Sequence, residues 1–207
     1  MDNNGRFMIR EEMFSFIYQM ALSDATNRVA HNGERGILSE DYVKSRVLRY
    51  TECIVLGDNT FSFEDAVAEI QQFNSVVSFG MIQKLLNMVM KYFYIRFCDD
   101  LDIKKHFSVC HAPMDGLMRD FVFNSYRYIY NSNPGFTKSC AWSKLGDNDN
   151  PIIYYSAYQD AVDQLINCAN NHGFNIANRI EFDYSFYLNA RELRDGNISV
   201  QEIWHDR

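Results

Sequence analysis

The segment that most constrains the fold is a long, mostly apolar stretch between residues 76 and 97. Its apolar side chains recur every three or four positions, which is the period of an α-helix, and they leave only a narrow polar strip. These side chains are Ile82, Leu85, Leu86, Val89, Phe93 and Ile95. A helix with so little polar surface needs other elements to cover it. The sequence therefore predicts a long central helix inside a helical domain.

Shorter segments with the same period lie on both sides of it. Apolar faces predict helices over 7–22, from a Ser39 cap to Gly57, over 62–73, from Pro113 onward and over 154–168, with connections at 27–36 and 131–150. Ser62 followed by Asp65 resembles a capping box. Pro113 suits the first turn of a helix, because its missing N–H would have no helical partner there. The His172-Gly173 pair is expected to end its helix.

Residues 176–191 fit two periods. Their apolar residues alternate as in a strand, and they also fit a helical spacing through Ile176, Ile180, Tyr184, Tyr187 and Arg191. A single strand without a partner would leave its backbone groups unpaired, so a helix is favoured. No repeat or Pro-rich linker divides the 207 residues, and their 47% hydrophobic content is enough for one core. The sequence predicts a single compact all-α domain over residues 1–207.

Charge and cysteine usage narrow the classes of function. A formal net charge of −7 opposes a strongly basic nucleic-acid-binding face, although it allows a local basic patch. Five cysteines without a C-x-x-C pair argue against a disulfide framework and a structural zinc site, and fit a reducing cytoplasm. The N-terminus lacks a signal-peptide pattern, and no apolar run is long enough to predict a membrane span. No cofactor or metal is expected.

Lys84, Asn87 and Lys91 form the first group of candidate functional residues. Their spacing of three and four places them on one edge of the long helix. A solvated edge is the simpler interpretation for the lysines. An Asn inside a helix is less easily explained, since Asn is a poor helix former and often has a hydrogen-bonding role there. The alternative interpretation is an edge that faces a cleft.

His111 and Asp115 form the second group, four residues apart around the predicted helix start at Pro113. Asp115 in a first helical turn would stabilise the unpaired N–H groups of that turn, by about 0.3 to 1 kcal/mol, and this role alone would explain it. The functional alternative is an ionised Asp115 that stabilises a developing cation or activates water. Cys110 and His111 lack further ligands at the customary spacing of a metal site.

Trp142 and Lys144 lie in the long connection before residue 151. A Trp in a loop most often anchors that loop to the core, and this interpretation is preferred. The alternative is a platform on which a nucleobase stacks beside Lys144 and Lys138, an interaction worth about 1 to 3 kcal/mol per base.

The order of Gly80, Lys84, Pro113, Asp115 and Arg119 resembles the core of the helix-hairpin-helix DNA glycosylases. That resemblance covers about residues 80–119. It implies that Lys84 is an amine that attacks the sugar carbon, and that Asp115 stabilises the positive charge on the deoxyribose. It also implies a flipped base in an aromatic-lined pocket. The hairpin of that family carries a Gly-x-Gly turn, whereas Ser78-Phe79-Gly80 supplies one glycine.

The Lys84, His111 and Trp142 segments together also resemble a group of small bacterial proteins of uncharacterised activity, a resemblance that implies no reaction. The leading hypothesis is a nucleic-acid-binding or nucleic-acid-processing protein. Lys84, Asp115 and His111 would be its catalytic residues, and Asn87, Lys91, Arg119, Trp142 and Lys144 would bind its ligand. One alternative is a noncatalytic interaction domain that binds another protein or its own copy. A second alternative is a small-molecule hydrolase with His111 as base and Asp115 as orienter.

Overall fold

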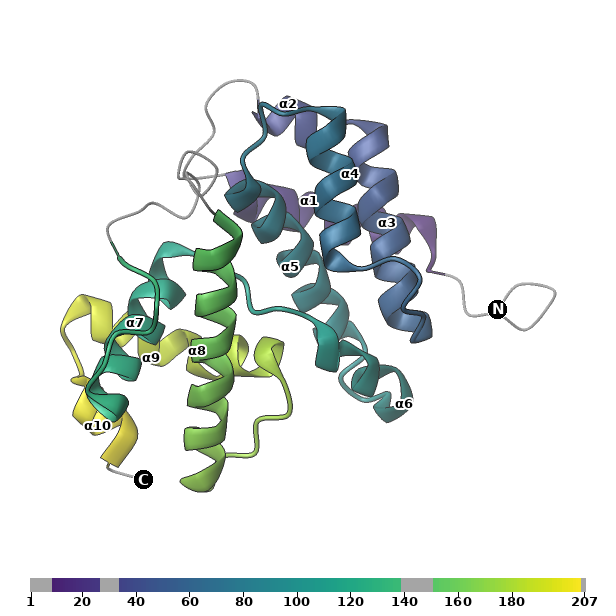
Figure 1. The fold of residues 1–207 in the computed structure, drawn as a ribbon. Coiled ribbons are helices and arrows are strands. Elements are labelled where there is room, and N and C mark those ends of the chain that lie inside the picture. The colour runs from purple at the N-terminus through teal and green to yellow at the C-terminus, as the bar shows by residue number, and fades with distance from the viewer. Residues whose placement is uncertain (1–8, 27–33, 139–150, 206–207) are drawn as a thin grey trace. The chain divides into compact units, whose positions relative to one another are not determined.

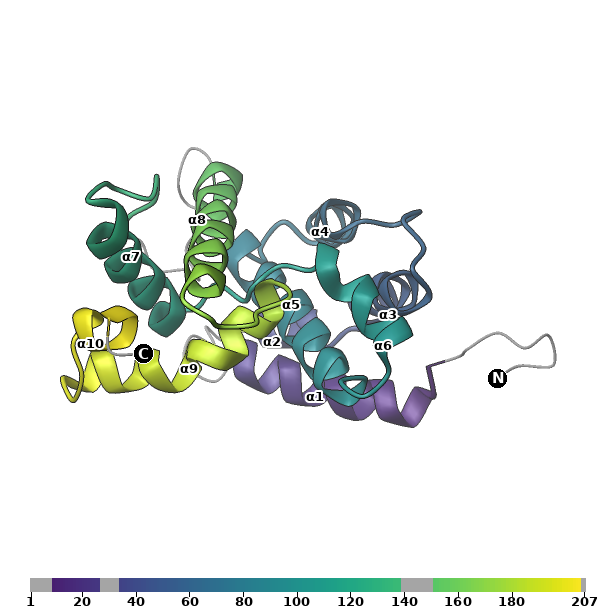
Figure 2. The same ribbon diagram turned by 90° about the horizontal axis from the view of Figure 1, so that it is seen from below.

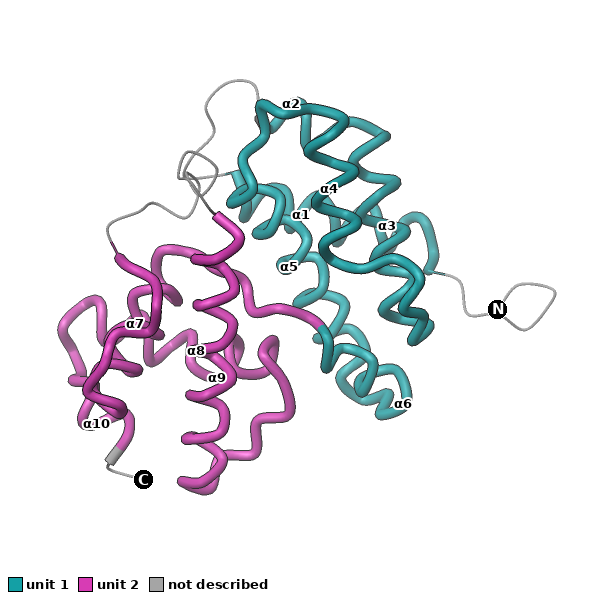
Figure 3. The backbone as a smooth tube through the Cα atoms, in the orientation of Figure 1, with its two compact units in different colours: residues 1–109 teal, residues 110–207 magenta. Residues whose placement is uncertain are grey.

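The computed structural model describes residues 9–26, 34–138 and 151–205, and every regular element within them is a helix. The prediction of an all-α chain is confirmed. By its internal packing the chain forms two compact units, residues 1–109 and residues 110–207 (Figure 3). This division does not test the prediction of a single domain, because two compact units can belong to one cooperative domain. Each unit is described below by itself.

Unit 1 is built from six α-helices and one 3₁₀ helix in its described residues (Figure 1). In chain order they are α1 (Glu11–Thr26), α2 (Glu34–Leu38), α3 (Asp41–Leu56), α4 (Phe63–Phe73), α5 (Phe79–Arg96), α6 (Leu101–Lys104) and η1 (Lys105–Val109). Helix α5 packs along α1 and also contacts α3 and α4, while η1 returns to α3. The predicted long central helix is therefore the core element of this unit.

Helix α5 begins at Phe79, where the Ser78 hydroxyl accepts a hydrogen bond from the Met81 N–H, three residues later than predicted. The side chains of Leu85, Leu86, Val89 and Phe93 are fully buried. On α1, Phe14 packs against Phe93 with ring centroids 6.4 Å apart. The buried Tyr18 hydroxyl, also on α1, donates to the Leu38 carbonyl and so attaches α2 to the core.

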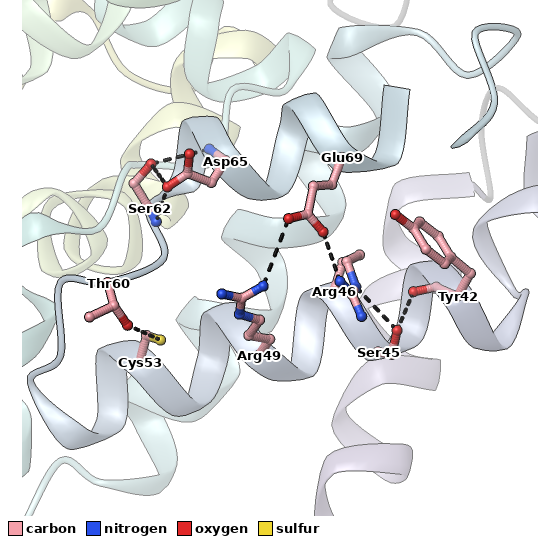
Figure 4. Close-up of polar contacts among 9 residues, drawn as sticks. All are labelled: Tyr42, Ser45, Arg46, Arg49, Cys53, Thr60, Ser62, Asp65 and Glu69. Atoms are coloured by element: carbon pink, nitrogen blue, oxygen red, sulfur yellow. Dashed lines mark hydrogen bonds and ion pairs between the residues drawn. The ribbon is translucent and has the colours of Figure 1, made fainter. Parts of the chain in front are cut away.

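A row of cross-helix contacts joins α3 to α4 on their polar side (Figure 4). The Glu69 carboxylate of α4 accepts a hydrogen bond from Arg46 Nη1 at 2.8 Å, and its other oxygen lies 3.8 Å from Arg49 Nη1. Both arginines are on α3. Ser62 and Asp65 form the predicted capping box, in which each side chain accepts the backbone N–H of the other. The Ser62 N–H and the Ser62 hydroxyl both donate to the Asp65 carboxylate and lower its pKa.

Two predictions at the N-terminal side of α3 are wrong. Ser39 does not cap this helix, because α3 begins at Asp41 and the Ser39 hydroxyl donates to the Gly36 carbonyl instead. The short helix α2 also occupies part of the connection that was predicted for residues 27–36. A five-residue helix is too short to show a helical period in the sequence.

Unit 2 consists of α7 (Gly116–Tyr130), α8 (Pro151–Asn171), α9 (Arg179–Asp195) and α10 (Val200–His205) within the described residues. Helices α7, α8 and α9 all contact one another, and α10 packs on α7 (Figures 1 and 2). The core is aromatic: Phe186 stacks with Phe121 at 5.5 Å and with Trp204 at 5.3 Å. The helix predicted for the tail is confirmed as α9, and His172-Gly173 ends α8, with Gly173 at a φ of +88°.

None of the described helices combines the length and the hydropathy that crossing a membrane requires.

Gly57 ends α3 in the left-handed region, with a φ of +69°, and a Cβ there would lie 2.9 Å from His106 Nε2. The His106 ring is held in place because its Nδ1 lies 3.0 Å from the Val55 carbonyl oxygen. We expect Gly57→Ala to lose about 1–2 kcal/mol from the backbone conformation, and more from the clash. Urea denaturation measures this loss.

A His106→Ala background provides the control, because it removes the clash and leaves the conformational cost. Gly196→Ala is a second control, since Gly196 has a φ of +78° and open space around it. An equal loss for Gly57→Ala in both backgrounds would contradict the role assigned to His106.

Candidate functional site

The residues predicted to form one site belong to different parts of the chain. Lys84, Asn87 and Lys91 lie on α5 in unit 1, whereas His111, Asp115 and Arg119 lie at the start of unit 2. Trp142 and Lys144 lie outside the described residues. The structure thus brings the first three together on one helix and the next three together in one segment, and each group is considered separately.

The polar edge of α5 has the predicted spacing, and two of its three residues are buried. Lys84 is only 8% exposed and Asn87 is fully buried, whereas Lys91 is half-buried. The Asn87 amide donates to Gln83 Oε1 at 3.1 Å, and the buried Gln83 amide in turn donates to the Gly80 carbonyl at 3.0 Å. Asn87 therefore has the hydrogen-bonding role expected of a mid-helix Asn. Gly80 and Lys84 both lie within α5, so Gly80 does not form a hairpin turn before the lysine.

Residues 110–115, here called the clamped segment, are irregular and fastened by α8. The Ala112 N–H donates to Gln159 Oε1 at 3.0 Å, and Gln159 Nε2 donates to the Ala112 carbonyl at 2.9 Å. One residue earlier on α8, the buried Tyr158 hydroxyl donates to the Pro113 carbonyl at 3.2 Å. Ala112, Pro113, Tyr158 and Gln159 are all buried. Two neighbouring side chains thus satisfy three backbone groups that water does not reach.

His111 and Cys110 belong to the clamped segment and pack within unit 2. The His111 ring stands edge-on to Tyr155 of α8, with centroids 5.4 Å apart, and Cys110 is fully buried. The sequence predicted a helix over residues 154–168, but Gln159 was not singled out in it. The available signal was a Gln inside an otherwise apolar helical face, since a buried amide needs hydrogen-bonding partners.

Asp115 is the N-cap of α7. Its Oδ1 accepts the Met118 N–H at 2.9 Å, and α7 begins at the next residue, Gly116. The prediction that Pro113 lies in the first turn is therefore wrong, because the cap falls two residues later. The geometry favours the capping interpretation of Asp115, in which the carboxylate stabilises the N–H groups that have no helical partner. Arg119, one turn further, is 8% exposed and its guanidinium binds Asp120 at 2.9 Å.

Charges around the clamped segment act on Tyr158. Its pKa is raised well above the ordinary value by complete burial and then by the nearby carboxylates of Asp183 and Asp115. Asp183 comes from α9 and is itself 2% exposed. Because the phenol stays protonated far into the alkaline range, it remains a hydrogen-bond donor to the Pro113 carbonyl. Stability from this group is present at neutral pH and is lost as pH rises through the raised pKa.

The described residues do not favour a nucleophilic cysteine paired with a histidine. The Cys168 thiol lies 3.7 Å from His172 Nδ1, but the same nitrogen lies 2.8 Å from the Cys168 carbonyl oxygen and so carries a proton that it donates there. Partial burial raises the pKa of the Cys168 thiol, which disfavours the thiolate nucleophile. In the same described ranges, no three His, Cys, Asp or Glu side chains gather as metal ligands would.

The outer face of α9 carries an exposed apolar row that sequence reasoning assigned to no site. Tyr184 is 59% exposed, Tyr187 39% and Leu188 69%. These three residues, here called the α9 stripe, are spaced by three and four and so share one face of the helix. The opposite face, with Phe182 and Phe186, is buried. Among the described residues, Tyr184 has no hydrogen-bond or ring partner.

Comparison with protein-family models, with curated proteins and with solved structures finds no match to this chain.

Gln159→Leu tests the clamp on residues 110–115. Leucine fills a similar volume but leaves the buried Ala112 N–H and carbonyl without partners, and each unsatisfied group costs about 1–3 kcal/mol. We expect a loss of about 2–5 kcal/mol in the free energy of unfolding, measured by urea denaturation. The control is Gln164→Leu on the exposed side of α8, where Gln164 accepts the Tyr126 hydroxyl and where we expect a much smaller loss. Equal losses would contradict the clamp.

Substitution of Asp115 separates capping from catalysis. Asparagine is as good an N-cap as aspartate, so we expect Asp115→Asn to change stability by less than about 0.5 kcal/mol and Asp115→Ala to lose about 1 kcal/mol. Thermal denaturation of the two variants measures the difference. A residue kept for chemistry at the expense of stability would give the opposite result, an alanine variant more stable than the wild type.

Proposed function

We propose that this chain is a noncatalytic helical interaction protein that binds another protein through the α9 stripe. The observation that carries the proposal is the exposure of Tyr184, Tyr187 and Leu188 side by side on one helical face. Exposed apolar residues are common singly, but a contiguous row on a helix is typical of an interaction site. Tyrosine is also among the residues that contribute most to binding energy at interfaces.

The stripe lies on a rigid support. Directly behind it, Phe186 packs against Phe121 and Phe182, at 5.5 and 4.9 Å between ring centroids. At the start of α9, Arg179 forms a two-bond ion pair with Asp163 of α8, with N–O distances of 2.8 and 2.6 Å. A helix held in this way loses little conformational freedom on binding, which favours affinity. Covering one exposed Leu contributes about 1.5–3 kcal/mol.

The polar residues once considered catalytic support this proposal indirectly. Asp115 Oδ1 caps α7, and His111 packs edge-on to Tyr155 in a segment that Gln159 holds by its backbone. These contacts account for the residues without a reaction. Nucleic-acid processing through Lys84 and hydrolysis through His111 remain predictions. They receive no support from the packing of the clamped segment.

Leu188→Asp tests the proposed function. A carboxylate in the stripe cannot be buried against an apolar partner without a large desolvation cost, so we expect binding to weaken at least about tenfold. The measurement is quantitative affinity purification from the source cells, followed by reconstitution of any stoichiometric partner and determination of its Kd.

The matched control is Ser156→Asp, which adds the same charge at an exposed position of α8. The proposal predicts a partner that wild type and Ser156→Asp retain and Leu188→Asp loses. A partner set that is identical for all three proteins, or no stoichiometric partner for any of them, would exclude the α9 stripe as the binding surface.

A further inference from the structure

Helix α10 is attached to unit 2 by apolar side chains. Ile203 and Trp204 are each only 4% exposed, and the Trp204 ring stacks on Phe186 of α9, with centroids 5.3 Å apart and an angle of 23° between the planes. The helix also packs on α7. Across the described part of unit 2, no hydrogen bond or ion pair joins residues 198–204 to the helices that they cover.

The polar groups of α10 bond within its own first turn. Glu202 Oε2 accepts the Ser199 N–H at 2.6 Å, and the Ser199 hydroxyl accepts the Glu202 N–H at 3.3 Å, which is a capping box. The buried Trp204 indole N–H has no acceptor among the described residues. A buried donor without an acceptor weakens the docked state, and a six-residue helix has little stability of its own. Helix α10 can therefore leave α7 and α9 without breaking a hydrogen bond to them.

Gly196 closes the connection between α9 and α10. It ends α9 in the left-handed region, with a φ of +78°, and there is open space where a Cβ would lie. The next residue, Asn197, donates its N–H to the Glu192 carbonyl at 2.9 Å. With Gly196 in a helical conformation instead, α9 would continue into α10, and Trp204 would lie about 27 Å along the axis from Phe186, at 1.5 Å per residue. A continuous helix thus cannot place α10 on its own site.

We propose that the surface of α7 and α9 beneath Trp204 is an interaction site for a second copy of this chain, and that two copies exchange their α10 helices there. The second copy carries the same α10, so its Trp204 stacks on Phe186 as the chain's own does. Because each copy gives one α10 and receives one, the exchange closes a twofold-symmetric pair. Phe186 lies on the face of α9 opposite the stripe, and the inference does not depend on the proposed function.

The connection determines when exchange occurs. A short tether keeps α10 at an effective concentration in the millimolar range at its own site. The wild type therefore stays monomeric in dilute solution and exchanges α10 only as its own concentration approaches that range. Strain in the closed connection favours exchange at lower concentration, because the extended connection relieves that strain in both copies.

Gly196→Ala tests the exchange, because alanine disfavours the left-handed conformation and leaves the docking surfaces unchanged. We expect this variant of the full-length chain to form a dimer at least about tenfold more tightly than the wild type. Light scattering coupled to gel filtration measures the mass over a concentration series. At the low concentrations used for urea denaturation, the same variant should remain monomeric. The matched control is Gly173→Ala at the end of α8, where φ is +88° and the space is equally open, and it should not form a dimer.

Two further measurements test the site itself. The double variant Gly196→Ala with Trp204→Ala should be monomeric, because α10 then has no ring to place on Phe186. A labelled peptide of residues 198–205 should bind the full-length Trp204→Ala chain at least about tenfold more tightly than the wild type, whose own tethered α10 competes with it. The same peptide carrying Trp204→Ala should bind neither. Fluorescence anisotropy measures these affinities, and this arm does not depend on whether Gly196→Ala folds.

Three results would overturn the inference: a folded Gly196→Ala that stays monomeric up to about 1 mM, a dimer that Gly173→Ala forms equally well, or a dimer that survives the loss of Trp204. If Gly196→Ala does not fold, failure of the peptide to bind the Trp204→Ala chain would overturn it instead. Leu188→Asp added to Gly196→Ala should leave the dimer intact. Loss of the dimer in that variant would assign self-association to the α9 stripe and reject exchange.

Discussion

Unit 2 depends on the way the side chains of α8 complete the hydrogen bonding of the irregular segments on either side of it. Gln159 pairs with both backbone groups of Ala112. Three turns later, Asn170 pairs in the same way with Ile176, at 3.0 and 2.8 Å. A side-chain amide can satisfy a donor and an acceptor at once, as a neighbouring strand would. Irregular backbone can therefore be buried in an all-helical unit without the cost of unpaired polar groups.

The hydrogen bonds from α8 side chains to irregular backbone give residues 110–115 a structural role. The segment that contains His111 and Asp115 has the residue types of an active site, and its described contacts serve to join and start helices. An apolar row that packing leaves exposed lies on the outer face of α9, whose inner face completes the aromatic core. The same helix thus stabilises unit 2 and presents a surface for binding. Separation of the two faces allows the outer one to vary without loss of the fold.

Local patterns in the sequence predicted much of the helical content. The apolar period identified α5, α8 and the tail helix, and the Ser62 capping box and Gly57 marked helix ends, because each of these signals depends on residues close in the chain. Short helices such as α2 and α10 were not predicted, because they are too short to show a full helical period in the sequence.

The pairing of Gln159 with Ala112 was not predicted either, for a different reason. Gln159 and Ala112 are 47 positions apart, and no local rule selects which buried amide pairs with which backbone. The sequence also did not show that the candidate residues belong to two different units, because that division depends on packing. The edge of α5 was predicted correctly as a face, but its burial could not be, since burial depends on what other elements cover.

The measurement that tests the clamp most directly is hydrogen exchange of the Ala112 and Ile176 amides, followed by NMR. Our account predicts that both exchange as slowly as amides in the middle of α8, with opening free energies close to that of unfolding the unit. Exchange of these two amides as fast as that of Asn133, an exposed residue outside any helix, would show that the pairings are not maintained in solution. The assignment of residues 110–115 to a structural role would then be wrong.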